Sequence, residues 1–143
     1  MGTGEQNKQL FEPWQMEAFV GSNVEYYEGK WGNSSGNSGS NWAGFFTGLI
    51  WAVYRKMYLE AVIVWVIVVV LSYILQADWP VWIGGIIFGF GGNEAYRWKL
   101  ERIVKKSQGL EREEQEALLK QKGGTNPILA AIVVGLIFLP LFL

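Results

Sequence analysis

The sequence predicts an all-α integral membrane protein: a small helical bundle with three transmembrane helices, one interfacial or partly sunk amphipathic helix and a flexible N-terminal arm. Three observations predict this class. Half of the 143 residues are apolar and only 17% are charged, where soluble domains carry about a quarter. Asp78 is the only charge between positions 61 and 93, and no charge follows Lys122. Apolar runs of helical length lie in these charge-poor stretches.

Residues 1–41 form a polar N-terminal arm with two basic and five acidic residues. No cationic start precedes an apolar run, so we expect no cleavable signal peptide. Ser22 and Glu25 have the spacing of a capping box, which predicts a short helix over 24–27. The apolar residues of this helix are too few to build a core. The glycine, serine and asparagine residues of 29–41 predict a flexible tether.

The membrane domain, residues 42–143, begins with an amphipathic segment at 42–54. Its apolar side chains recur at helical spacing, and small residues form a separate face. As a helix the segment is about 20 Å long, which is short for a crossing, so an interfacial or partly sunk helix is favoured over a full span. The apolar stripe consists of Trp42, Phe45, Phe46, Leu49, Ile50 and Val53.

The strongest predicted span is the first transmembrane helix at residues 57–77. Eleven aliphatic residues lie between Val62 and Leu75, and at the bilayer centre they favour insertion by roughly 3–7 kcal/mol. The β-branched run would also suit a buried strand. A lone strand in lipid leaves its backbone groups unpaired, so a helix is predicted.

Two further spans are predicted, the second at residues 79–96 and the third at residues 127–143. The second contains a glycine-rich apolar run and begins beside Pro80, which suits a first helical turn. A tight turn around Asp78 joins it to the first span. The third begins at Pro127 and runs for 17 residues without a charge.

A charged, amphipathic helical loop at 97–122 separates the second span from the third. We expect a helix that continues out of the second span along the membrane surface and ends near Gly109. Residues 110–122 then form a second helix, and 123–126 turn the chain back. Two roles remain open for the basic residues of the loop: anchoring alone, or docking of anionic lipid or a partner.

Basic residues predict the orientation, because short cytoplasmic loops are rich in Lys and Arg. Basic residues precede the first span and follow the second. The arm is therefore expected to be cytoplasmic, the Asp78 turn to lie outside and the C-terminus to be periplasmic. The residues assigned to the membrane interface or to lipid are Trp42, Trp51, Arg55, Lys56, Trp79, Trp82, Arg97, Lys99, Arg102, Lys105 and Lys106.

Small residues four positions apart occur in three of the expected helices. In lipid, such residues let two helix backbones approach closely and gain dispersion contacts. They predict close packing within the chain or against a partner. The helix-packing residues are Gly44, Gly48, Ala52, Gly85, Gly89, Ala131 and Gly135.

The residue types exclude several chemistries. The chain has no Cys and no His, which excludes thiol nucleophiles, thiolate metal sites and imidazole catalysis. Glu60 and Glu94 could meet at the cytoplasmic side, but neighbouring Arg and Lys residues are their expected partners. No phosphate loop or nucleophile elbow is present. We predict no enzyme activity, no catalytic residue, no cofactor, no metal site and no nucleic-acid partner.

Two stretches resemble a known family. The first combines 19–27, FVGSNVEYY, with 41–58, NWAGFFTGLIWAVYRKMY, and the second is 92–96, GNEAY. Over residues 19–96 the chain resembles the uncharacterised bacterial membrane family called domain of unknown function 2628. It departs from that family at Gly44 and at Thr47-Gly48, where bulkier or proline-containing versions are usual. The resemblance implies a multi-pass protein of the bacterial inner (plasma) membrane and brings no activity.

We therefore expect a non-catalytic accessory or scaffold subunit of a larger bacterial inner-membrane complex of respiratory, photosynthetic or secretion type. The small-residue ridges, the interfacial tryptophans and the tethered arm favour it. Its expected partners are the lipid bilayer, other membrane protein subunits and, as a candidate, anionic lipid. The alternative is a small oligomeric channel or a holin-like membrane-permeabilising protein, in which the glycine faces would line a pore.

Overall fold

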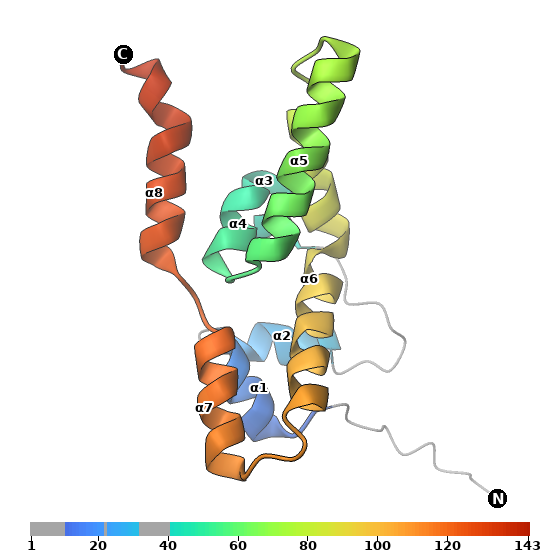
Figure 1. Cartoon of the computed structure of the whole chain (residues 1–143), viewed down its shortest axis with the longest axis vertical. Coiled ribbons are helices and arrows are strands. Elements are labelled where there is room, and N and C mark those ends of the chain that lie inside the picture. Colours follow the sequence, from blue (N-terminus) through green and yellow to red (C-terminus); the bar gives the residue numbers. More distant parts are fainter. Residues whose placement is uncertain (1–10, 22, 32–40) are drawn as a thin grey trace, which may run out of the picture.

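The computed structural model describes residues 11–21, 23–31 and 41–143, and all regular structure in these residues is helical. The prediction of an all-α fold is therefore confirmed. Figure 1 shows the helices arranged along one long axis. They are α1 (Pro13–Val20), α2 (Val24–Trp31), α3 (Trp42–Thr47), α4 (Leu49–Tyr54), α5 (Tyr58–Leu75), α6 (Val81–Lys106), α7 (Arg112–Lys122), α8 (Pro127–Phe138) and the short 3-10 helix η1 (Leu139–Leu141).

Helix α6 connects the two ends of the molecule (Figure 1). It has 26 residues, which span about 39 Å. Residues 81–93 carry no charge and pack against α3 and α5, which together with α4 and α8 form what we call the apolar end. Residues 94–106 are rich in charge and lie beside α2 and α7, which together with α1 form the polar end.

Two segments of the described chain are long and apolar enough to cross a membrane. One is α5, and the other is an apolar window within 112–141, a stretch that the structure divides into the polar α7 and the apolar α8 with η1. Only 17% of the apolar stretch in α5 is buried in the protein, and only 6% of the apolar stretch in the second segment. Neither segment therefore packs as the core helix of a water-soluble domain does.

The prediction of three spans is not confirmed. The first predicted span, 57–77, corresponds to α5, and the third, 127–143, corresponds to α8 and η1. The second, 79–96, is not among the segments that are long and apolar enough to cross a membrane. Its apolar part ends before Glu94 and is about 20 Å long, whereas the hydrocarbon core of a bilayer is about 30 Å thick.

The amphipathic segment predicted as one helix at 42–54 forms two short helices, α3 and α4. Gly48 ends the first and begins the second, with a φ of +50° that favours glycine. The small-residue face is turned inward, whereas the apolar stripe is exposed at its start and half-buried from Leu49 to Val53. Trp42 is 67% exposed and Phe46 is 77% exposed. Because the helix is interrupted at Gly48, the segment 42–54 is still less suited to span the membrane.

The N-terminal arm contributes apolar residues to the core of the protein, a contribution that the sequence did not predict. The short helix expected over 24–27 is confirmed as α2, and α1 precedes it. These helices do not form a core of their own. They complete a shared core with α4, α6 and α7. The arm contributes buried Phe11, Met16, Phe19, Val20, Tyr27 and Trp31.

Other features of the arm differ from the expectation or lie beyond the structure. Helix α1 has the capping box, in which the backbone N–H of Glu12 donates to Oε1 of Gln15 at 2.9 Å. The capping residue expected for α2, Ser22, lies outside the described residues. So do positions 32–40 of the expected tether, while 29–31 belong to α2.

The loop at 97–122 contains the two helices that the sequence predicts, the end of α6 and α7. The first continues straight out of the apolar end rather than bending across it (Figure 1). The turn after α7 is held against α1, because the backbone N–H of Gly124 donates to the carbonyl of Phe19 at 2.5 Å. A Cβ on Gly123 would overlap that carbonyl, so a glycine is required at this position.

Candidate functional site

Helices α3 and α6 meet at glycines, and we call this contact the glycine seam. A Cβ on Gly44 would lie 2.6 Å from the carbonyl oxygen of Phe88. A Cβ on Gly89 would lie 2.8 Å from Cβ of Phe45, and one on Gly85 would overlap the carbonyl oxygen of Phe45. Any larger residue would therefore separate the two backbones and lose their dispersion contacts.

Asn41 holds the start of the seam. Its backbone N–H donates to the carbonyl of Gly89 at 2.7 Å, and its Oδ1 accepts from the N–H of Gly44 at 2.9 Å. Gly48 lies beside the backbone of Gly84 and Gly85, one turn earlier on α6, and Ala52 is fully buried. Four of the residues assigned to helix packing, Gly44, Gly48, Gly85 and Gly89, thus lie where α3 and its end contact α6, and a fifth, Ala52, is buried on α4.

The other two packing residues, Ala131 and Gly135, are not brought to the seam. A Cβ on Gly135 would meet nothing within 4 Å, and both residues are exposed on α8. Helix α8 contacts α4 near its own start, where Ala130 is buried and the N–H of Asn126 donates to the carbonyl of Tyr54 at 2.7 Å. Beyond that point α8 stands apart from α5 and α6 (Figure 1).

A buried arginine lies where the polar end meets the apolar end. Arg55 is only 4% exposed. Its Cζ is 4.9 Å from the ring centroid of Tyr27, 5.7 Å from that of Tyr54 and 5.6 Å from that of Tyr96. Its Nη1 donates to the carbonyl of Val20 at 3.3 Å. Such cation–π contacts strengthen when the cation is removed from water.

Aromatic rings from three segments surround this arginine. The Tyr27 centroid lies 4.9 Å from that of Trp31 and 5.1 Å from that of Tyr96, and Trp51 packs edge-on to Tyr96 at 6.4 Å. Burial raises the pKa of Tyr27 to about 12, although Arg55 opposes this rise. The phenol therefore stays neutral at physiological pH. We name the group the junction cluster: Tyr27, Trp31, Trp51, Arg55, Asn93 and Tyr96.

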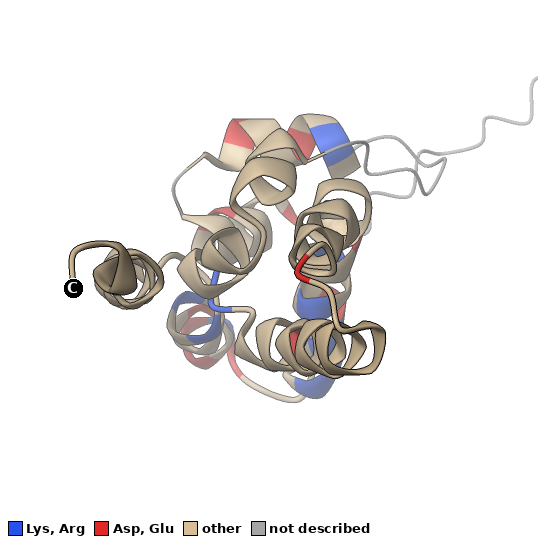
Figure 2. Ribbon diagram, turned by 90° about the horizontal axis from the view of Figure 1, so that it is seen from above, with Lys and Arg blue, Asp and Glu red and all other residues tan. Residues whose placement is uncertain are grey.

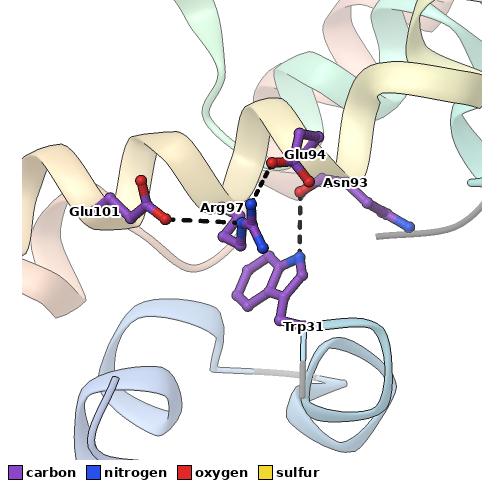
Figure 3. A network of polar contacts seen from close by, with 5 residues as sticks. All are labelled: Trp31, Asn93, Glu94, Arg97 and Glu101. Atoms are coloured by element: carbon purple, nitrogen blue, oxygen red, sulfur yellow. Dashed lines mark hydrogen bonds and ion pairs between the residues drawn. The ribbon is translucent and has the colours of Figure 1, made fainter. Parts of the chain in front are cut away.

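Asn93 joins the arm to α6. Nε1 of Trp31 donates to the backbone carbonyl of Asn93 at 3.2 Å, as Figure 3 shows, and Nδ2 of Asn93 donates to the hydroxyl of Tyr26 at 3.1 Å. The preceding residue is a glycine because a Cβ on Gly92 would lie 2.9 Å from Cζ3 of Trp51. The cluster thus links α2, α4 and α6 through one cation, several rings and one amide.

A cavity of about 510 Å³ opens beside the junction cluster. Its wall combines aromatic faces with amides and the buried guanidinium. Helix α8 contributes to it through Ala130. The other lining residues include Tyr26, Tyr27, Asn41, Trp51 and Arg55. Within the described part of the chain, no group of three or more Asp or Glu residues is arranged to hold a metal ion.

The tryptophans assigned to the membrane interface have two different environments. Trp42, Trp79 and Trp82 are exposed at the apolar end. Trp51 and Arg55 are instead buried inside the protein, as members of the junction cluster. Both residues come just before the first predicted span in the sequence, which is why they were assigned to the interface. They are buried because α2 folds over them.

The basic residues assigned to the interface also differ in their surroundings. Arg97 is ion-paired with Glu94 and Glu101 along α6 (Figure 3), with Nε 3.8 Å from Oε1 of Glu101. Lys105 and Lys106 are exposed at the end of that helix. The remaining three converge on a second cavity: Lys56, Lys99 and Arg102.

Sequence reasoning did not identify Tyr27, Trp31, Asn93 and Tyr96 as one site. One signal was available. Tyr27 and Trp31 are four residues apart on α2, and Asn93, Tyr96 and Leu100 recur on one face of α6 at helical spacing. Each set forms a stripe, but neither indicates that the two stripes face each other.

Comparison with known proteins agrees with the resemblance noted in the sequence. A family model described as "Protein of unknown function (DUF2628)" matches residues 21–102. Searches of curated proteins and of solved structures find no match. The matched region contains every residue of the junction cluster and covers more than half of the chain. The chain therefore belongs to the DUF2628 family of proteins of unknown function.

Proposed function

We propose that this protein is a non-catalytic integral membrane protein that acts as an accessory or scaffold subunit of a larger bacterial inner-membrane complex. The observation that carries the proposal is the position of α8. This wholly apolar helix is exposed along most of its length and stands apart from α5 and α6 (Figure 1).

The exposed apolar surface supports a location in lipid. Large apolar side chains are exposed along α5, on the first half of α6 and on α8. In water, exposed apolar area costs about 25 cal/mol per Å² relative to burial, and a contiguous patch of this kind marks a membrane or protein interface. Lipid removes this cost for the sides of the helices.

The distribution of charge supports one orientation in that membrane. Figure 2 views the molecule from the apolar end, and no Lys or Arg is coloured on α5, on α8 or on the turn between α5 and α6. The basic residues of α6 and α7 lie toward the polar end. By the positive-inside rule the polar end is cytoplasmic and Asp78 is outside.

The open face of α8 supports a partner of a particular kind. Gly135 meets nothing within 4 Å, so a neighbouring backbone can approach α8 closely at that point. Lipid chains are flexible and fill such a surface poorly, whereas another transmembrane helix can pack against it. The proposed partner is therefore a transmembrane helix of another subunit.

The subunit role is tested by mild detergent extraction followed by native sizing. We expect the wild-type chain to migrate in a complex larger than its own 16.2 kDa. Gly135→Leu should release it, while the volume-conserving control Ile132→Leu on the same helix should not. A wild-type chain that is monomeric and binds nothing would contradict the proposal. Ion flux through liposomes that contain only this protein would favour the channel alternative.

The orientation is tested by cysteine labelling, which is simple because the chain has no Cys. Asp78→Cys should react with a membrane-impermeant maleimide in intact spheroplasts. Lys106→Cys at the polar end is the matched control and should react only after lysis. Labelling of position 78 only after lysis would reverse the proposed topology.

A further inference from the structure

A second cavity, of about 440 Å³, lies where the start of α5 meets α6 and α7. Positive charge dominates its wall. Four of the eight lining residues are basic and one is acidic. The basic residues come from three separate parts of the chain: Lys56 from the turn before α5, Lys99 and Arg102 from α6, and Lys122 from the end of α7.

Backbone contacts hold two of these lysines in position. Nζ of Lys99 donates to the carbonyl of Lys56 at 2.7 Å, and Nζ of Lys56 donates to the carbonyl of Gln121 at 3.3 Å. Nη2 of Arg102 lies 3.1 Å from Oε1 of Glu60, the single carboxylate of the wall. One negative charge therefore faces four positive charges inside the cavity.

The electrostatic strain is visible at Lys99. The pKa of Lys99 is lowered to about 8, and burial of its ammonium group is the main cause. Glu60 opposes this shift, whereas the positive charges of Lys56, Lys122 and Arg102 contribute to it. These groups face Lys99 from α5, α6, α7 and the turn before α5. On the α1 side its neighbour is the ring of Phe19, whose centroid is 5.9 Å from Nζ. An anion in the cavity would relieve this repulsion.

The cavity continues into an apolar stripe on α5. Leu59 lines the cavity, and Ile63, Val66 and Val70 follow it at four, seven and eleven positions along the helix. All four side chains are exposed. Residues at this spacing share one helix face, so the stripe runs from the basic cavity toward the apolar end. The combination of a basic pocket and an adjoining apolar stripe matches a molecule with an anionic head and a hydrocarbon chain.

We propose that this cavity binds the phosphate headgroup of an anionic phospholipid, with an acyl chain lying along the Leu59–Val70 face of α5. The assignment rests on the membrane location given under the proposed function, and it does not depend on the subunit role. It locates lipid binding at one site, in contrast to general attraction of a basic surface to the membrane.

The test is native mass spectrometry of the full-length protein released from detergent with added phosphatidylglycerol or phosphatidylcholine. We expect retention of phosphatidylglycerol only. The double substitution Arg102→Gln with Lys122→Gln should weaken its binding by about 25-fold, since each basic residue near an anionic lipid contributes about fivefold. The control, Lys105→Gln with Lys106→Gln, removes equal charge from α6 outside the cavity and should leave binding within about twofold of the wild type.

Two further measurements extend the test. Glu60→Gln removes the carboxylate of the wall and should strengthen binding by about fivefold. Raising the pH from 7 to 9 should weaken binding, because Lys99 loses its proton over this interval.

Three results would overturn the assignment: equal retention of both lipids, equal loss in the cavity and control variants, or displacement of the lipid by inorganic phosphate at equal concentration. The last result would identify free phosphate as the ligand. A lone monomer that still selects phosphatidylglycerol would contradict the subunit role and leave the cavity assignment intact. Recovery of the chain in the soluble fraction, measured before lipid is added, would contradict the membrane location itself.

Discussion

Replacing Gly85 with alanine is expected to lower the free energy of unfolding by about 1–3 kcal/mol, the usual cost of inserting a methyl group into a well-packed contact. The added Cβ would overlap the backbone carbonyl of Phe45, which belongs to α3 and cannot rotate away as a side chain can. Helix α3 must therefore move off α6. The hydrogen bond from Asn41 to the carbonyl of Gly89 lies in the same seam and should weaken with it.

Gly91→Ala on the same helix is the matched control. A Cβ at Gly91 meets nothing within 4 Å, and alanine is favoured over glycine in a helix by about 1 kcal/mol. This variant should be neutral or stabilising. The measurement is the thermal unfolding midpoint of both variants in the same detergent. Equal midpoints for Gly85→Ala and Gly91→Ala would show that the glycine seam contributes no packing energy.

Arg55→Ala should destabilise the protein by about 2–4 kcal/mol, the range for creating a cavity in a core with loss of desolvated cation–π contacts. The substitution removes the guanidinium from between Tyr27 and Tyr96 and leaves the carbonyl of Val20 without its donor. Since these contacts join α1, α2 and α6 to α4, we expect the polar end to loosen first.

Arg112 offers a matched control, because its Cζ lies 4.8 Å from the ring centroid of Trp14 but the residue is exposed. Arg112→Ala should cost about 0.5–1 kcal/mol, the value for a cation–π contact in water. Limited proteolysis and thermal unfolding measure both effects. A similar loss of unfolding free energy in Arg55→Ala and Arg112→Ala would contradict the special role of burial at Arg55.

Local patterns allowed several elements to be predicted. The charge-free run before Asp78 predicts α5, and the charged stretch followed by two glycines predicts α7 and its end. The spacing of Gly44, Gly85 and Gly89 indicated where backbones could approach closely. It did not indicate that α3 and α6 are the two partners, because one residue spacing is compatible with many neighbours.

The junction cluster could not be predicted, since it depends on contacts between segments far apart in the chain. Trp31 and Asn93 are 62 positions apart, and no periodicity within either helix links them. The sequence therefore predicted only a short helix at 24–27, with too few apolar residues to build a core. This helix alone has few apolar residues, but the arm adds its aromatic rings to a core that α6 and α7 also form. The bend at Gly48 was missed for a related reason: several glycines lie nearby, and only the folded chain selects the one with positive φ.

The continuity of α6 has a mechanical consequence. Helix α6 is a single rod about 39 Å long. Asn93 and Tyr96 hold it near its middle, so the two halves on either side of them are of similar length. A tilt of about 10° around that pivot displaces each tip by about 3 Å in opposite directions. A tilt imposed on the glycine-rich half of α6 would therefore also move the far tip of the helix and the turn into α7, while the hydrogen bonds within the helix stay intact.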